Sequence, residues 1–512
     1  MLQHLHDHWP VVPLLAIGIF ATGFHAIPIL TVLYPALLLH YSRKQWLHVV
    51  FAYAISSLST TLAILGMFDG EVDAPSFQHP GTVFALSLFG NLVVLWCLAV
   101  DHLVQHTCIW QRILVFPCIW AGSWLLFTAL APFGDIYVFS NPVLGWSDLV
   151  QAAATIGGRP MIDFVLALGC TVLLELKHTK WDNPVFLQDE EDATDESMPR
   201  PVQWWKSPTT LYAIFIGVLL FYGGIQTSIY PGSFFQVGYP DYVPDTVPVG
   251  CVVGPGNIHQ ELQLQHEHWF NKTTKLAQAG AKMILWSEET AQVHDPEEES
   301  KLLERGKEIA QEQSVYIAVT YDLLGPIQQN KLVLITPQGD IGIDYIKAHP
   351  VPFVEPQPAG PNVLPFVDTP EFGRVGAAIC FDFNFPSFML QASKNKIDLM
   401  LQASWTWGPI GTYHSQGNSL RAVENGFTML RCGSQGLSGV FEPVSNGLFT
   451  QHVPSVNDND YIFNLPLRKR RWTLYGFLGD VFGYVCLVLG IGAAGYRLYQ
   501  IIQEKRTSNI EL

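Results

Sequence analysis

Long uncharged apolar runs dominate the first 235 residues of the chain. Four of them lack Lys, Arg, Asp and Glu altogether, at residues 9–40, 45–68, 82–100 and 113–134. Two more follow at 161–176, which contains Asp163 and Glu175, and at 207–240. A helix needs about 20 apolar residues to cross a bilayer. We therefore expect residues 1–235 to form a membrane-embedded helical bundle.

The first run predicts two short spans rather than one. Its 32 residues are too many for one ordinary crossing, and Gly23 and His25 lie near its middle. Four prolines interrupt it: Pro10, Pro13, Pro28 and Pro35. A tight turn near 24–27 would give about seven spans within residues 1–235. One tilted span is the alternative, and it would reverse the side on which the next loop lies.

The pattern changes between residues 240 and 467, where charges are frequent and apolar runs are short. Runs typical of buried strands occupy 282–286, 315–321, 375–381 and 397–402, and a hairpin is predicted at 332–336 and 341–345. Helices are predicted at 297–313, 386–394 and 415–426. Strands that alternate with helices indicate an α/β domain. Residues 474–498 predict a closing span, the eighth in all, and 499–512 a cytoplasmic tail.

Composition and charge exclude several classes of protein. Charged residues make up 14% of the 512, whereas soluble proteins carry about 25%, so the whole chain is not a soluble enzyme. The net charge of −16 argues against a nucleic-acid partner. Much of the acidity lies in a loop predicted at 177–206. Eight cysteines in this length do not form a disulfide framework, and Cys251 and Cys432 match no catalytic motif.

Basic residues near the span ends predict the orientation. With eight spans, ten basic residues lie on one side: Arg43, Lys44, Arg112, Lys177, Lys180, Arg200, Lys206, Arg497, Lys505 and Arg506. Five lie on the other side, namely Arg159 and residues 468–471. We therefore expect an integral multi-pass membrane protein with both termini in the cytoplasm. The α/β domain would then lie on the extracytoplasmic or luminal side.

Three polar residues end predicted strands of this domain. Glu288 follows 282–286, Lys347 follows the hairpin, and Cys380 ends the run Ala378-Ile379-Cys380. A thiol nucleophile needs a base, which a carboxylate supplies. An ammonium group stabilises the thiolate and the oxyanion of a tetrahedral intermediate. The three residues are a coherent set for acyl transfer if they meet in space, which their spacing alone does not show.

Four ordered segments carry a resemblance to a known family. They are Ile284-Leu285-Trp286-Ser287-Glu288, the segment from Lys347 to Glu355, Ile379-Cys380-Phe381-Asp382 with Pro386, and Leu420-Arg421-Ala422-Val423-Glu424-Asn425-Gly426. These segments resemble the nitrilase (carbon–nitrogen hydrolase) superfamily. Together with the framing spans, they resemble its membrane-bound apolipoprotein N-acyltransferase family.

The resemblance implies a nitrilase-type αββα sandwich and a Glu-Lys-Cys triad. Glu288 would be the general base, Lys347 the oxyanion stabiliser and Cys380 the nucleophile. Supporting residues would be Glu355, Asp382 and Glu424. Substrate-proximal residues would be Trp286, Phe381, Trp405 and Trp407. In the family, a phospholipid acylates the cysteine and the acyl group passes to an amine, without a metal or cofactor.

Departures from the family pattern leave the acceptor open. Ser287 replaces a proline, Phe381 a tyrosine and Asp382 a glutamate, and residues 405–409 differ from the family's loop. A membrane-tethered amidase that passes the acyl group to water is therefore the alternative to a transferase. An inactive scaffold is disfavoured by the intact triad. His259, His266 and His268 lack companion ligands of metal-site spacing.

Overall fold

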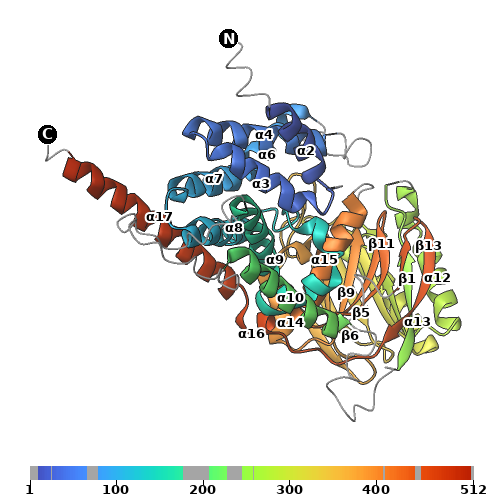
Figure 1. Ribbon diagram of the computed structural model, residues 1–512. Coiled ribbons are helices and arrows are strands. Elements are labelled where there is room, and N and C mark those ends of the chain that lie inside the picture. The colour runs from blue at the N-terminus through green and yellow to red at the C-terminus, as the bar shows by residue number, and fades with distance from the viewer. Residues whose placement is uncertain are drawn as a thin grey trace.

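The computed structural model describes residues 10–24, 26–65, 79–176, 207–227, 245–257, 259–406, 410–443 and 451–508. These residues form a helical bundle and an α/β domain that pack side by side (Figure 1). The N-terminal helices and the C-terminal helix belong to the bundle, and the chain between them forms the α/β domain. The acidic loop predicted at 177–206 lies outside the described residues.

Among the residues that the structure describes, the bundle contains six helical segments that are long and apolar enough to cross a membrane. These segments are α4 (Trp46–Ile64), the joined α6 (Pro80–Gly90) and α7 (Leu92–Val104), α8 (Ile109–Leu130), α9 (Ser147–Glu175), α10 (Pro208–Thr227) and α17 (Val481–Ser508). The protein is therefore a membrane protein with a helical bundle, as the apolar runs predicted.

The first apolar run forms two helices, as expected, but both are short. They are α2 (Val11–Ala21) and α3 (Leu30–Ser42), with 11 and 13 residues. At 1.5 Å per residue they are about 17 and 20 Å long, whereas the hydrocarbon core is about 30 Å thick. The eight apolar segments expected from the sequence are therefore all helical among the described residues, six of them long and two of them short.

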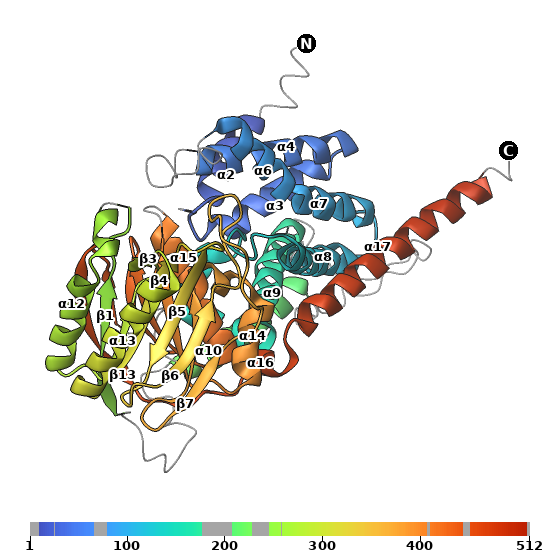
Figure 2. The same ribbon diagram turned by 180° about the vertical axis from the view of Figure 1, so that it is seen from behind.

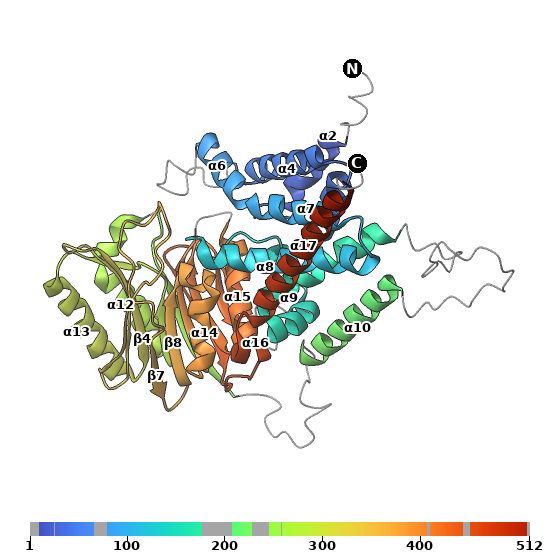
Figure 3. The same cartoon turned by 90° about the vertical axis from the view of Figure 1, so that its left-hand side faces the viewer.

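The closing helix differs from its predicted limits at both ends. A short helix, α16 (Leu474–Leu478), precedes α17, and Gly479 with a φ of 64° separates them. At its other end α17 continues to Ser508, through residues predicted to form a tail (Figure 3). Residues 499–508 contain no Pro or Gly and include Gln, Glu, Lys and Arg, which favour a helix even where the apolar pattern stops.

Two sheets form the core of the α/β domain. The first has the order β13-β1-β2-β4-β5-β6, with β3 also paired to β4, and the second has the order β12-β11-β10-β9-β8-β7. The strands of the first sheet are β1 (Thr246–Val253), β2 (Met283–Trp286), β3 (Ala291–Val293), β4 (Tyr316–Leu323), β5 (Gln329–Ile335), β6 (Ile341–Ile346) and β13 (Asn459–Pro466). The second sheet contains β7 (Phe366–Thr369), β8 (Gly373–Ile379), β9 (Leu399–Trp405), β10 (Thr428–Ser434), β11 (Leu437–Phe441) and β12 (Gln451–Pro454).

Helices cover the outer faces of both sheets. Helices α12 (His266–Gln278) and α13 (Pro296–Gln313) pack on the first sheet, as Figure 2 shows. Helices α14 (Pro386–Lys394) and α15 (Ile410–Asn425) lie between the second sheet and the bundle, where α15 contacts α9. The predicted αββα sandwich is thereby confirmed.

A disulfide joins the two sheets through strands β1 and β10. Cys251 of β1 and Cys432 of β10 are bonded, with 5.4 Å between their Cα atoms. Both side chains are fully buried. The cysteine count gave no sign of this bond, because the two residues are 181 positions apart in the sequence.

Candidate active site

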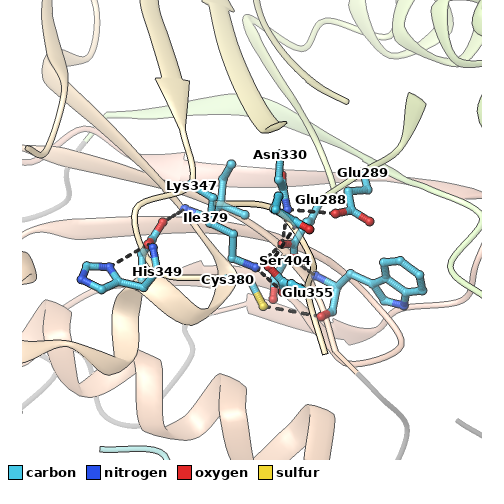
Figure 4. A network of polar contacts seen from close by, with 12 residues as sticks. Glu288, Glu289, Asn330, Lys347, His349, Glu355, Ile379, Cys380 and Ser404 are labelled. Carbon is cyan, nitrogen blue, oxygen red and sulfur yellow. Dashed lines mark hydrogen bonds and ion pairs between the residues drawn. The ribbon is translucent and has the colours of Figure 1, made fainter. Parts of the chain in front are cut away.

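Strand directions bring the three predicted catalytic residues to one place. Strands β2 and β4 are parallel, and β6 is two antiparallel steps from β4, so β2 and β6 end at the same edge of the first sheet. Glu288 and Lys347 follow these two strands. Cys380 follows β8 of the facing sheet, and it begins the 3-10 turn η4 (Cys380–Asn384) with a φ of 44°. Figure 4 shows the three side chains converging.

Lys347 lies at the centre of the site. Its ammonium group donates to Glu288 Oε1 at 2.7 Å and to Glu355 Oε1 at 2.6 Å, and the Lys347 side chain is 0% exposed. Burial alone would lower the pKa of Lys347, but Glu288 and Glu355 raise it well above its ordinary value. The amine therefore stays protonated and supplies a fixed positive charge beside Cys380.

Glu288 is held on both carboxylate oxygens. Asn330 Nδ2 donates to Oε1 at 2.8 Å, and the backbone N–H of Trp405 donates to Oε2 at 2.6 Å. The same Asn330 amide donates to the neighbouring Glu289 at 3.0 Å. Burial and the charge of Glu288 raise the pKa of Glu289 well above its ordinary value. Ionisation of Glu289 is therefore disfavoured beside the ordered Glu288.

The Cys380 thiol is protonated at rest. It is 5% exposed, and it donates to the carbonyl of Trp405 at 3.5 Å. Burial and the nearby Glu288 raise the pKa of Cys380, against the opposing effect of Lys347. An attack by this thiol therefore needs a base, and Glu288 is the carboxylate in place to accept the proton.

The two predicted supporting residues near the triad have different contacts. Glu355 binds Lys347, and burial raises the pKa of Glu355 to about 7, even though the Lys347 charge opposes the shift. Asp382 does not bind Lys347. Its carboxylate accepts hydrogen bonds from the backbone N–H of Ile379 and His349 and from the hydroxyl of Tyr345, at 2.7–2.9 Å. Asp382 thus ties the turn that carries Cys380 to the segment that carries Lys347.

Glu424, predicted as a third supporting residue, lies at the junction with the bundle. It accepts from the backbone N–H of Arg159 at 2.8 Å and pairs with Arg421 at 2.7 Å. Arg159 and Arg421 both bind Asp135, at 2.8 and 2.6 Å. Glu424 therefore anchors α15 to α9, through Arg159 of the bundle and Arg421 of its own helix.

The sequence predicted that Trp286 lies next to the substrate, and the structure corrects this prediction. Alternate residues of β2 face opposite sides, and Trp286 points away from the sandwich interior into the core beneath α12. It is fully buried, donates from Nε1 to Thr273 at 2.9 Å, and packs against Phe270 with 5.1 Å between ring centroids. Trp286 is a packing residue.

The other predicted substrate-proximal residues have distinct positions. Trp405 orders Glu288 through its backbone, and its indole donates to Gln435 at 2.9 Å. Trp407 lies outside the described residues. Phe381, the residue after the nucleophile, lines an apolar cavity of about 160 Å³ between the two parts of the protein.

This cavity is lined from both the bundle and the α/β domain. Its walls include Phe24, Ile64, Val83, Phe89, Gly90, Phe127, Ile136 and Tyr137 of the bundle, and Val351, Phe381 and Ile410 of the domain. Almost all of its lining is hydrocarbon, so it suits an apolar chain rather than a polar substrate. The cavity therefore lies between the helices of the bundle and Phe381, the residue that follows Cys380 in the sequence.

Sequence reasoning missed three polar residues of the site. Asn330 orders Glu288. Ser404 and Arg431 lie behind the thiol, and Arg431 donates to the Ser404 hydroxyl at 3.0 Å. A charged residue inside the apolar run Thr428-Met429-Leu430-Arg431-Cys432 was the available signal, because buried strands rarely carry an unpaired charge.

The three histidines noted in the sequence do not form a cluster of metal ligands. His266 bonds to the carbonyl of Gln292 at 2.8 Å, and His268 bonds to Asp458 at 2.6 Å. In the part of the chain that the structure describes, no group of three or more His, Cys, Asp or Glu residues is placed to hold a metal ion.

Comparison with known proteins agrees with this geometry. Residues 257–451 match the carbon-nitrogen hydrolase family. The apolipoprotein N-acyltransferase of Rickettsia prowazekii is 23% identical over 331 residues, which cover 57% of this chain and 62% of that protein. A formamidase of Bradyrhizobium diazoefficiens is 27% identical over 122 residues, which cover 23% of this chain and 35% of that protein.

An amidase from Nesterenkonia sp. is a similar solved structure, with a TM-score of 0.38 and 17% identity over 44% of this chain and 92% of that chain. The chain spans between 35% and 62% of the length of the first two curated relatives named above. The resemblance inferred from the four motifs is confirmed by the family match and by the acyltransferase relative.

Proposed function

We propose that this protein, an enzyme of the carbon–nitrogen hydrolase (nitrilase) superfamily, moves an acyl group from a membrane lipid through a thioester on Cys380 to an amine. The observation that carries the proposal is the position of Phe381. It adjoins the nucleophile in sequence and lines an apolar cavity shared with the membrane helices. An acyl chain in this cavity would lie with its carbonyl end toward Cys380. A lipid donor also explains why a thiol enzyme is built on a membrane bundle.

In the first half-reaction Glu288 takes the thiol proton while Cys380 Sγ attacks the ester carbonyl carbon. Lys347 stabilises the negative charge that develops on the carbonyl oxygen. When the tetrahedral intermediate collapses, the C–O bond of the ester breaks. Glu288 then returns the proton to the leaving alcohol. The products are a thioester on Cys380 and a lysolipid.

In the second half-reaction an amine attacks the thioester carbonyl. Glu288 accepts a proton from the amine, the C–S bond breaks, and the sulfur leaves as a thiolate. That thiolate then takes the proton back from Glu288, which restores the resting site. The name of the Rickettsia relative supports an amine acceptor.

For the membrane arrangement, we propose a bundle at 1–235, a catalytic domain at 240–467 and a closing helix that begins near 474. Both termini would be cytoplasmic and the catalytic domain extracytoplasmic or luminal. The count of basic residues favours this orientation. The Cys251–Cys432 bond is a second support, because disulfides persist in oxidising compartments and are rare in the cytosol.

The alternative is a hydrolase, in which water replaces the amine in the second half-reaction. The name of the formamidase relative favours this alternative. Both candidates share the first half-reaction and the same residues, so they differ only in the acceptor.

The test begins with the purified full chain in phospholipid–detergent micelles. Intact-mass measurement is expected to show one added acyl chain on the wild type and none on Cys380→Ala. Added primary amine should then remove the adduct and yield an amide. Release of free fatty acid without amide would select the hydrolase. Absence of any adduct on Cys380 with lipid donors would contradict a lipid substrate.

A further inference from the structure

A second buried cation lies behind the nucleophile. Arg431 is on β10, in a strand that is buried along its whole length, and its own exposure is 0%. Its Nε donates to the carbonyl of Leu437 at 2.9 Å, and one terminal nitrogen donates to Ser404 Oγ at 3.0 Å. The other terminal nitrogen, also buried, has no acceptor within the described residues.

No carboxylate among the described residues forms an ion pair with Arg431, whereas the other fully buried arginine is paired. Arg421 binds Asp135 at 2.6 Å and Glu424 at 2.7 Å. A buried charge without a partner costs several kcal/mol, and burial lowers the pKa of Arg431 to about 10. We infer that the buried cation of Arg431 stabilises a negative charge that forms only during the reaction.

The balance of charges around Lys347 indicates where this negative charge forms. Lys347 is bound by two carboxylates, Glu288 and Glu355. When both are ionised, the group has one positive and two negative charges. A thiolate or an oxyanion at Cys380 would add another negative charge, and Lys347 alone does not balance it. Arg431 is the nearby cation that is not already neutralised.

Ser404 connects Arg431 to the nucleophile. Its hydroxyl accepts from the guanidinium at 3.0 Å and lies beside the Cys380 side chain. Burial and Glu288 raise the pKa of the thiol, while Lys347, Ser404 and Arg431 all lower it. Figure 4 shows Ser404 close to Cys380 in the same network.

We propose that Arg431 is a positioning residue for the nucleophile, which favours the thiolate of Cys380 through its charge and through the Ser404 hydroxyl. The proposal rests on the role of Cys380 in the proposed function, but it does not depend on the identity of the donor or the acceptor.

The test measures how fast iodoacetamide alkylates Cys380 at different pH values, followed by mass spectrometry of the peptide that contains Cys380. The reaction forms an S–C bond and releases iodide, and only the thiolate reacts appreciably. The full chain is compared with Arg431→Gln, Arg431→Lys and Ser404→Ala. The control is Arg374→Gln, since Arg374 lies on β8 of the same sheet but pairs with Asp368 at the surface.

Arg431→Gln is expected to move the midpoint of the rate–pH curve upward by about one unit, which means roughly tenfold slower alkylation below the midpoint. Ser404→Ala should move it less, Arg431→Lys should restore part of the shift, and Arg374→Gln should not move it. A lower yield of reactive protein with an unchanged midpoint would show a purely structural role and overturn the proposal.

If Arg431→Gln does not fold, Ser404→Ala and Arg431→Lys decide the question. An unchanged midpoint in Ser404→Ala overturns the link, and an upward shift supports it. No lipid takes part in the alkylation by iodoacetamide. The alkylation rate therefore measures the effect of Arg431 even if the protein never accepts an acyl chain. The failure of this inference is thereby separate from the failure of the proposed function.

Discussion

Lys347 and Glu288 form a fully enclosed ion pair, with 2.7 Å between Nζ and Oε1 and side-chain exposures of 0% and 4%. Neither group can exchange its partner for water. The same lysine also binds Glu355, so one ammonium group sets the positions of two carboxylates. The proposed base, Glu288, and the proposed oxyanion stabiliser, Lys347, are therefore a single unit, and a change in one alters the other.

Lys347→Met is expected to abolish the acyl adduct, with a loss of about 10²–10³ in rate from the missing oxyanion stabiliser. Because Glu288 and Glu355 lose their buried counter-ion, stability should also fall by about 3–5 kcal/mol. Adduct formation by intact mass and thermal unfolding check the two effects.

The matched control for this variant is Lys331→Met. Lys331 is a mostly buried lysine on β5 that pairs with Glu299 at 2.7 Å, away from the triad. The Lys331→Met variant should be less stable than the wild type, but each folded molecule should still form the acyl adduct. Equal loss of activity in both variants would contradict a chemical role for Lys347.

Glu355 predicts a pH dependence of stability. Burial raises the pKa of Glu355 from its ordinary value of 4.5 to about 7 in the folded protein. A carboxyl group with a raised folded pKa contributes stability that is complete below its unfolded pKa and is lost as pH rises through its folded pKa. Stability should therefore fall between about pH 4.5 and pH 7, by roughly 2–3 kcal/mol from this group.

Thermal unfolding of wild type and Glu355→Gln across this range measures the effect. The variant should show a flatter curve, since its amide does not titrate. Glu424, whose pKa burial also raises to about 7, titrates in the same window in both proteins. A slope that Glu355→Gln leaves unchanged would assign the dependence to groups other than Glu355.

The strand ends that carry the triad were predictable because local pattern defines them. Apolar runs followed by Glu288 and Cys380, and a hairpin turn before Lys347, locate three strand ends without any long-range information. The strand order that brings them together came from the family resemblance, since pairing between distant strands leaves no local trace.

Trp286 and Arg431 show where pattern reasoning stops. A motif placed Trp286 near the substrate, but the side that a strand residue faces depends on which sheet face is covered, and α12 covers this one. Arg431 was visible as a charge in an apolar strand, yet its partner Ser404 lies 27 positions away on β9. The Cys251–Cys432 bond likewise depends on how the two sheets stack.

The disulfide should stabilise the catalytic domain without taking part in the chemistry. The double variant Cys251→Ser/Cys432→Ser is expected to lose about 2–5 kcal/mol of stability and to keep acyl-adduct formation at temperatures where it is folded. Urea unfolding and intact mass measure the two properties. Loss of adduct in a folded double variant would contradict this separation of roles.

The same bond gives a test of the proposed orientation. Protein isolated from its native membrane with thiols blocked should contain Cys251 and Cys432 in the disulfide form, because the extracytoplasmic side is oxidising. Finding both as blocked free thiols would place the domain in a reducing compartment and reverse the orientation.

Gly90 offers the sharpest test of the apolar cavity. It ends α6 and lines the cavity next to Phe89, and a Cβ atom added there meets nothing within 4 Å. Gly90→Leu should therefore fill part of the cavity without a clash. We expect at least a tenfold loss of adduct formation from long-chain phospholipids, because about 1.4 kcal/mol of lost chain binding already gives that factor.

Gly217→Leu is the matched control, since a Cβ atom at Gly217 of α10 also meets nothing within 4 Å and the residue does not line the cavity. Iodoacetamide should alkylate Cys380 at the wild-type rate in both variants, because neither alters the triad. A short-chain donor should be affected less than a long-chain donor in Gly90→Leu. Equal rates for long and short donors in that variant would show that the acyl chain does not occupy this cavity, and the lipid route to Cys380 would have to lie elsewhere.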